Sequence, residues 1–159
     1  MERKNILIVL AFILLCEAAG NIGSIFTFPE ITTWYVSISK PGFTPPNWVF
    51  GPVWTTLFAL MGVSLYLVWK QGLKEKKVRI ALSVFGAQLV LNILWSILFF
   101  GAKLLFAAFV EIVTLWIAIL LTIIAFYRVQ KKAGIILVPY LLWVTLATLL
   151  TYYVWLLNP

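Results

Sequence analysis

The residues best suited to chemistry in this 159-residue sequence lie in short stretches of otherwise apolar chain. One stretch carries an amide and aromatic stripe whose members are spaced by four, three and four residues, Gln88, Asn92, Trp95 and Phe99. This spacing puts all of them on one face of a helix. An amide between flat rings can orient a planar ligand, and it can equally hydrogen-bond a neighbouring helix. The spacing alone leaves both interpretations open, a ligand-binding wall and a set of interhelical hydrogen bonds.

A second helical face near the carboxyl end combines aromatic and small residues, Tyr140, Trp143, Ala147 and Thr151. The small Ala147 leaves a gap beside the bulky Trp143 indole. Further up the chain, Trp54 stands about two turns into another apolar run. By their depth in these runs, Asn92, Trp95, Trp54 and Trp143 are expected to line one cavity that opens toward one side of the molecule.

Acid–base and metal chemistry have little material in this chain. It contains no histidine and a single cysteine, Cys16, so metal ligands and an internal disulfide are not expected. Two acids, Glu17 and Glu111, lie inside apolar runs without a deep Lys or Arg beside them. Paired carboxylates can relay protons, but a role as neutral hydrogen-bonding groups is favoured here. We expect no metal and no cofactor.

The elements that must hold these residues are membrane-spanning helices. The chain is 64% hydrophobic and 11% charged, with mean hydropathy +1.06, far from the roughly one quarter charged residues of soluble domains. A spanning helix needs about 20 apolar residues, and five such runs occur, at 6–28, 46–69, 78–100, 104–127 and 133–156. They predict an all-α integral membrane protein, a five-helix bundle forming one membrane domain over 1–159. Trp116, without a polar neighbour on its own face, is expected to pack or to face lipid, and Pro139 is expected to kink or begin a helix.

The first apolar run has a second interpretation, as a cleaved signal peptide that would leave four spans. A basic start precedes the run, and CEAAG follows it. Leu15 is a poor match to the small residue that a lipoprotein cleavage site needs, and the apolar stretch continues to Phe28. Five spans are therefore favoured.

The basic residues are distributed unevenly between the two sides. Lys40 and Lys103 fall on one side, and the other side holds Arg3, Lys4, Lys70, Lys74, Lys76, Lys77, Arg79, Arg128, Lys131 and Lys132. The positive-inside rule then places the amino terminus in the cytoplasm, and the 29–45 connection and the carboxyl terminus outside. The net charge of +7 follows this topology, so nucleic acid is not an expected partner. The bias suits the cytoplasmic membrane of a prokaryote.

The long connection contains the stretch WYVSISKPGFTPPNWVFGPVW, which holds four of the seven prolines. Prolines restrict the backbone, so we expect 29–45 to form a rigid lid. Trp34 and Trp48 fit either this lid or an interfacial aromatic belt. Small residues, among them Gly20, Gly23 and Ser24 and the pair Ser83 and Ala87, support close helix contacts and a homodimer.

The chain resembles the TspO/MBR family, the tryptophan-rich sensory proteins related to the mitochondrial translocator protein. The likeness extends over nearly the whole sequence, through GNIGS, WY…KPGFTPPNWVFGPVW, MG…YLVWK, QLVLNILWSILFFGAK, PYLLWVTLATLL and WLLN. The resemblance implies a five-helix bundle, usually dimeric, that binds porphyrins, sterols and benzodiazepine-type drugs. Carried over by position, it implies a ligand site formed by Trp34, Tyr35, Trp48, Trp54, Asn92, Trp95, Phe99, Trp143 and Ala147. Some members are reported to degrade protoporphyrin IX in light, and their two deep indoles match Trp54 and Trp143, the candidate catalytic residues.

Three positions depart from the family pattern. Phe43 stands where tryptophan is frequent, and Thr151 where asparagine is common. After Tyr152 and Tyr153 no basic residue follows, although the proposed cholesterol motif requires one. This difference argues against specific cholesterol binding.

The sequence favours a membrane-embedded binding protein or sensor for flat hydrophobic ligands, above all porphyrins such as protoporphyrin IX. A light- and oxygen-dependent porphyrin-degrading enzyme is one alternative. A transporter of porphyrin or lipid cargo, with Glu17 and Glu111 as a relay, is another.

Overall fold

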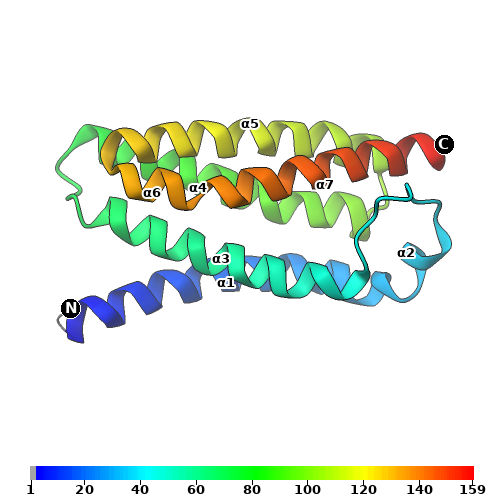
Figure 1. Ribbon diagram of the computed structural model, residues 1–159, viewed down its shortest axis with the longest axis horizontal. Coiled ribbons are helices and arrows are strands. Elements are labelled where there is room, and N and C mark those ends of the chain that lie inside the picture. Colours follow the sequence, from blue (N-terminus) through cyan, green and yellow to red (C-terminus); the bar gives the residue numbers. More distant parts are fainter. Residues whose placement is uncertain (1–2) are drawn as a thin grey trace.

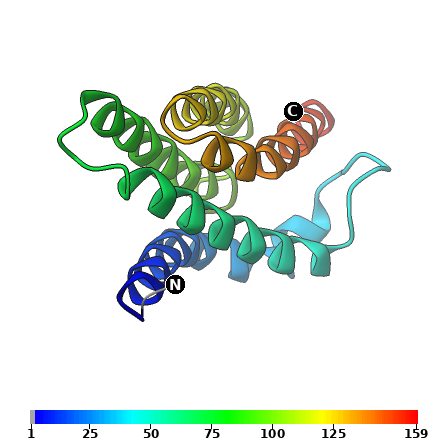
Figure 2. The ribbon, with the colours of Figure 1, turned by 60° about the vertical axis from the view of Figure 1, so that its left-hand side comes forward.

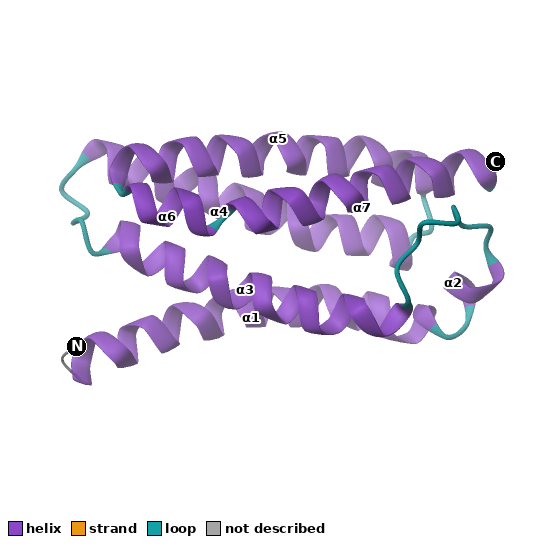
Figure 3. Ribbon diagram, in the orientation of Figure 1, coloured by secondary structure: helices purple, strands orange, loops and turns teal. Residues whose placement is uncertain are grey.

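The computed structural model describes residues 3–159, which form helices and connecting loops without any strand (Figures 1 and 3). In chain order the elements are α1 (Arg3–Ile31), α2 (Trp34–Ser37), α3 (Asn47–Trp69), α4 (Lys76–Ser96), the π-helical segment η1 (Ile97–Gly101), α5 (Leu105–Val129), α6 (Lys131–Ile136) and α7 (Val138–Leu157).

Five helical stretches among the described residues are long and apolar enough to cross a membrane: Asn5–Ile31, Asn47–Trp69, Lys76–Gly101, Leu105–Val129 and Lys131–Leu157. Large apolar side chains point outward from these stretches, such as Leu7 and Leu14 on α1 and Leu142 on α7. An apolar outer surface is stable in lipid, where a helix satisfies its own backbone hydrogen bonds. The predicted fold class, an all-α integral membrane protein with five spanning helices, is confirmed.

The long helices form two groups, α4, α5 and α7 in one and α1 and α3 in the other. α5 packs against both α4 and α7, while α1 packs along α3 and against α4. Figure 2 shows α1 at the edge of the bundle, next to α3. Phe85 of α4 stacks on Phe126 of α5 with ring centroids 5.5 Å apart. On the other side, a Cβ added to Gly62 of α3 would lie 2.4 Å from Cα of Ile13, so the absence of a side chain brings α1 and α3 together.

The last span consists of two helices. α6 ends at Ile136, and α7 begins at Val138 with a proline in its first turn. Pro139 has no N–H to donate to the preceding turn, so the helix restarts at this point. The Ser64 hydroxyl donates a 2.7 Å hydrogen bond to the Ala133 carbonyl and ties α6 to α3.

The connection after the first span is more helical than the expected lid at 29–45. α1 continues through Pro29 to Ile31, and Trp34–Ser37 forms α2, so only residues 32–33 and 38–46 of this connection lack helical structure. Asn158 fastens this segment to the end of α7, since its amide accepts from the Ser39 N–H (3.0 Å) and donates to the Ser39 carbonyl (2.9 Å). α2, this segment and the carboxyl terminus lie at the end opposite the amino terminus (Figure 1). We refer to it as the lid end of the bundle.

Candidate functional site

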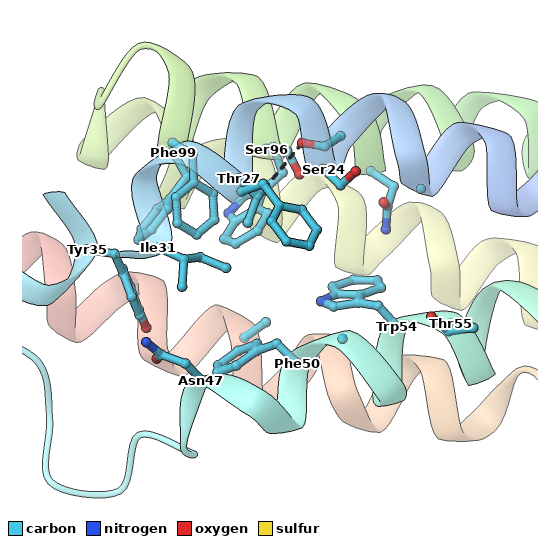
Figure 4. A pocket seen from close by; sticks show the side chains of 18 of the residues that line it. Ser24, Thr27, Ile31, Tyr35, Asn47, Phe50, Trp54, Thr55, Ser96 and Phe99 are labelled. Atoms are coloured by element: carbon cyan, nitrogen blue, oxygen red, sulfur yellow. Dashed lines mark hydrogen bonds between the residues drawn. The ribbon is translucent and has the colours of Figure 1, made fainter. Parts of the chain in front are cut away.

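A cavity of about 530 Å³ occupies the half of the bundle next to α2. Its walls come from α1, α2, α3, α4, η1 and α7, as seen for several of its side chains in Figure 4. This volume falls within the range of roughly 300–1,000 Å³ that is usual for small-molecule sites. The cavity can therefore hold a ligand of moderate size.

The structure brings most of the sequence-predicted site residues together on this cavity. Those that line it are Tyr35, Trp48, Trp54, Asn92, Trp95, Phe99, Trp143 and Ala147. Trp34 does not line it. Its ring packs against Phe99 and Phe100 at 5.6 and 6.2 Å, behind the wall. Because Tyr35 follows Trp34 directly in the short α2 and lines the cavity (Figure 4), Trp34 is directed elsewhere.

Stacked aromatic pairs form two opposite walls. On the α4 side, Trp95 stacks on Phe99 with centroids 5.1 Å apart and planes 20° apart. On α3, Trp54 stacks on Phe58 at 5.6 Å and 28°. In Figure 4, Phe99 and Trp54 lie on opposite sides of the space. Each pair is separated by four residues, so helix geometry alone aligns its rings.

Aromatic contacts also bridge α3 and α7 across the cavity. Phe50 meets Trp143 at 5.7 Å, edge to face, and Trp54 meets Tyr140 at 6.2 Å. Such edge-to-face contacts are favourable at these distances. Both rings of α3 therefore have fixed partners on α7.

Two indole N–H groups at the cavity lack an acceptor. The Nε1 atoms of Trp95 and Trp143 are buried and donate to no acceptor among residues 3–159. A buried donor without a partner costs about 1–3 kcal/mol. Both nitrogens are covered by neighbouring atoms, so this cost stays in the ligand-free cavity wall.

The amide stripe on α4 serves two purposes. Asn92 Nδ2 donates to the Tyr140 hydroxyl, which donates to Gln88 Oε1, each at 2.9 Å. Gln88 is buried and does not line the cavity, so it joins α4 to α7. Asn92 both lines the cavity and takes part in this junction. The ligand-wall interpretation thus fits Asn92, and the hydrogen-bonding interpretation fits both Gln88 and Asn92.

Further lining residues were not among the predicted ones, and most come from α1 and the start of α3: Gly20, Asn21, Ser24, Thr27, Asn47, Phe50, Gly51 and Thr55. The sequence signal for these lining residues is the patch of small residues on the first span, which from the sequence alone predicts helix packing. That interpretation fits Gly23, where an added Cβ would be 3.0 Å from Ser96 Oγ, but Gly20, Gly23 and Ser24 also line the cavity. Trp116 packs against the core, as expected, and its Nε1 also donates to Thr145 Oγ1 on α7 at 2.8 Å.

The lining is almost free of formal charge. Among residues 3–159, Glu17, near the amino-terminal limit of the cavity, is the only carboxyl that lines it, and no Lys or Arg does. Burial raises the pKa of the Tyr35 phenol above its ordinary value, so this group stays a neutral hydroxyl. Within residues 3–159 no three His, Cys, Asp or Glu side chains group as metal ligands would. The arrangement suits recognition by stacking and neutral hydrogen bonds.

Comparisons with known proteins agree with this architecture. The sequence pattern of the TspO/MBR family matches residues 12–156. The tryptophan-rich protein TspO of Archaeoglobus fulgidus is 46% identical over 155 residues, covering 97% of this chain and 99% of its own. The human translocator protein is 42% identical over 136 residues, covering 84% and 80%. The tryptophan-rich sensory protein of Cereibacter sphaeroides is 35% identical over 140 residues, covering 87% and 84%. With a match this long and relatives this similar, the chain belongs to the TspO/MBR family.

Proposed function

We propose that the protein binds a flat, mostly apolar small molecule in the cavity, and that this molecule is a tetrapyrrole such as protoporphyrin IX. The observation that carries the proposal is the combination of stacked aromatic walls with an almost uncharged lining that contains a few neutral polar side chains. Stacking favours a planar ring system, and neutral polar side chains such as Thr27 and Asn47 favour a ligand with hydrogen-bonding groups at its rim. A porphyrin with carboxyl side chains has both features. Drugs of the benzodiazepine type, which are flat and carry carbonyl groups, fit the same site.

Titration of the purified protein with protoporphyrin IX, followed by the quenching of tryptophan emission, tests this proposal. Trp143→Ala removes part of the aromatic wall, and we expect it to weaken binding about 5- to 150-fold, equivalent to about 1–3 kcal/mol. Asn92→Ala should also weaken binding, because it alters the wall and its junction with Tyr140. Trp116→Ala is the matched control, since Trp116 lies outside the cavity. Unchanged affinity in both cavity variants would refute the proposed site.

Light-dependent oxidation of a bound porphyrin by oxygen is the second candidate function. Trp54 and Trp143 line the cavity, and Trp54 also contacts Tyr140, whose hydroxyl is hydrogen-bonded on both sides. A hydrogen-bonded phenol next to an indole is suited to return an electron to an oxidised ring. Under light and oxygen, the porphyrin absorbance should then decay faster with the protein than without it, and more slowly in Trp143→Phe. Equal decay rates would exclude this activity.

Transport of the ligand has less support in the geometry. Glu17 lines the cavity, whereas Glu111 is buried in α5 and does not line it. The two acids are therefore not members of one lined path. Flux measurements in liposomes with Glu111→Gln test this alternative, and an undiminished flux would remove Glu111 from it.

We also propose that the amino terminus faces the cytoplasm of a prokaryotic cell and that the protein forms a homodimer. The exposed basic residues of the α3–α4 loop and the α5–α6 junction lie at the amino-terminal end, which supports the orientation. Ser83 and Ala87 lie exposed on α4 and offer a close-packing face. Cysteine labelling of the loops in intact cells tests the orientation, and light scattering in detergent with Ala87→Leu tests the dimer.

A further inference from the structure

The cavity is tightly packed at its amino-terminal limit, and the loops around the lid end are fastened by polar contacts. At the amino-terminal limit, Gly20 of α1 lies against the Phe58 ring, and an added Cβ would be 2.4 Å from it. At the lid end, Asn158 holds Ser39 through two hydrogen bonds. Lys103 forms a 3.0 Å ion pair with Glu30. Neither end therefore offers an obvious path for a large planar ligand.

Two sides of the cavity are closed as well. Between α1 and α4, a Cβ on Gly23 would meet Ser96 Oγ at 3.0 Å. Between α3 and α7, the Phe50–Trp143 and Trp54–Tyr140 contacts fill the space between the backbones. These closures leave the side between α1 and α3.

The α1–α3 side is framed by exposed or half-buried residues that also line the cavity, Asn21, Ser24 and Phe28 on α1 and Trp48, Gly51 and Thr55 on α3. We call this frame the α1–α3 window. Because the helices are antiparallel and Ile13 meets Gly62, the small pair Ser24 and Gly51 falls at the middle of the frame. In the part of the chain that the structure describes, no hydrogen bond or aromatic contact joins the two sides of the frame. A Cβ on Gly51 would have no atom within 4 Å.

The window lies within two membrane-spanning stretches, so lipid is expected around it. All six residues belong to the spanning stretches Asn5–Ile31 and Asn47–Trp69. Phe28 and Trp48, at its wider exposed corner, are each 75% exposed. Figure 4 shows the space between α1 and α3 with Ser24 and Thr27 on one side and Phe50 and Trp54 on the other. A molecule dissolved among acyl chains can thus approach the stacked walls without crossing an aqueous loop.

We infer that the ligand enters and leaves the cavity through the α1–α3 window, directly from the lipid phase. This inference rests on the proposed function, because it describes how the ligand of that cavity is exchanged. It assigns the ligand to the class of molecules that partition into the bilayer. It also implies that residues 38–46 form a fixed end of the cavity and are not the route of ligand entry.

The test is the dissociation rate of protoporphyrin IX from the protein in lipid nanodiscs, measured by transfer to an excess of empty vesicles. Gly51→Phe places a ring in the window, and we expect it to slow dissociation about tenfold, as blocked routes slow exchange. A ring that only took up binding space would accelerate dissociation, so the sign separates the two effects. Gly86→Phe is the matched control, because Gly86 on α4 also has no atom within 4 Å of an added Cβ and lies away from the cavity. Because Gly86 is next to the proposed dimer face of Ser83 and Ala87, light scattering checks that all variants compared have the same oligomeric state. Asn158→Ala, which loosens the lid, should leave the rate unchanged.

Equal rates in Gly51→Phe, Gly86→Phe and the unmodified protein would overturn the inference. A faster dissociation rate in Asn158→Ala combined with an unchanged rate in Gly51→Phe would indicate that the ligand is exchanged at the lid end, and would also overturn the inference. A protein that does not bind protoporphyrin IX would refute the proposed function instead. The window then has a ligand-free readout, the quenching of the Trp54-dependent emission by lipids with nitroxide-labelled acyl chains. Gly51→Phe should reduce this quenching and Gly86→Phe should not, whereas equal quenching in both would refute the window.

Discussion

Gly62 is the position at which a single methyl group should most disturb the bundle. A Cβ there would lie 2.4 Å from Cα and 2.6 Å from the backbone nitrogen of Ile13, against 3.4–4 Å for ordinary contact. The obstacle is helix backbone, which cannot rotate away as a side chain can. Gly62→Ala therefore forces α1 and α3 apart by about 1 Å at their closest point.

The expected size of the effect follows from two opposing contributions. Overpacking of a tight contact costs about 1–3 kcal/mol and occasionally more. Replacing glycine by alanine in a helix returns up to about 1 kcal/mol. We expect Gly62→Ala to lower the free energy of unfolding by about 1–3 kcal/mol, because backbone contact puts the cost at the upper end.

Gly86→Ala provides the same chemical change without the contact. No atom lies within 4 Å of an added Cβ at Gly86, so only the helix contribution remains and stability should rise by up to about 1 kcal/mol. Gly20→Ala should fall between the two, because the atoms it meets belong to the Phe58 ring, which can shift. The measurement is reversible unfolding in mixed detergent micelles with increasing denaturing detergent. If Gly62→Ala proved as stable as Gly86→Ala, the close packing of α1 on α3 would be wrong.

Three further perturbations address the polar contacts. Tyr140→Phe leaves Asn92 Nδ2 and Gln88 Oε1 without their 2.9 Å partner. Because each hydrogen bond in a membrane bundle contributes about 0.6–1.7 kcal/mol, the free energy of unfolding should fall by about 1–3 kcal/mol. A change below about 0.5 kcal/mol in the same unfolding assay would contradict the network. Lys103→Gln removes a partly exposed ion pair, so thermal unfolding should shift by the equivalent of less than about 1 kcal/mol and become less sensitive to salt. Asn158→Ala should speed amide hydrogen exchange at residues 38–46 while the exchange in α5 stays constant, whereas unchanged exchange at 38–46 would show that the lid is held by other contacts.

The fold class and the family were predictable from the sequence because their signals are local. Five apolar runs of spanning length determine the number of membrane-spanning stretches without any knowledge of how the helices pack. Likewise, the helical spacing of Asn92, Trp95 and Phe99 is enough to predict that they share a face. Where the signal spans one or two helical turns, the sequence contains the answer.

The parts that sequence could not resolve depend on partners that are distant in the chain. Gln88 and Asn92 lie one turn apart on the same helix face. Gln88 is nevertheless hidden from the cavity, because it accepts a hydrogen bond from Tyr140, which is about fifty residues away in the chain. Similarly, Trp116 finds the hydroxyl of Thr145 on another helix. Trp34 lies behind the cavity wall for a different reason. Its direction depends on the short helix α2, which no periodic pattern in the sequence predicts.

The location of the cavity follows from how side-chain size is distributed along α3. In its amino-terminal half, Phe50 and Trp54 reach across to Trp143 and Tyr140, and rings of this size keep the α3 and α7 backbones apart. Toward its carboxyl end, Gly62 allows the opposite, a direct backbone contact with α1. Lipid supplies no hydrophobic force to collapse the wider half, since association of membrane helices depends on packing and hydrogen bonds. A bundle that is tight at its glycines and held open by its aromatic pairs therefore keeps a lined space at the lid end, and the rings that hold it open are the same rings that a flat ligand would stack upon.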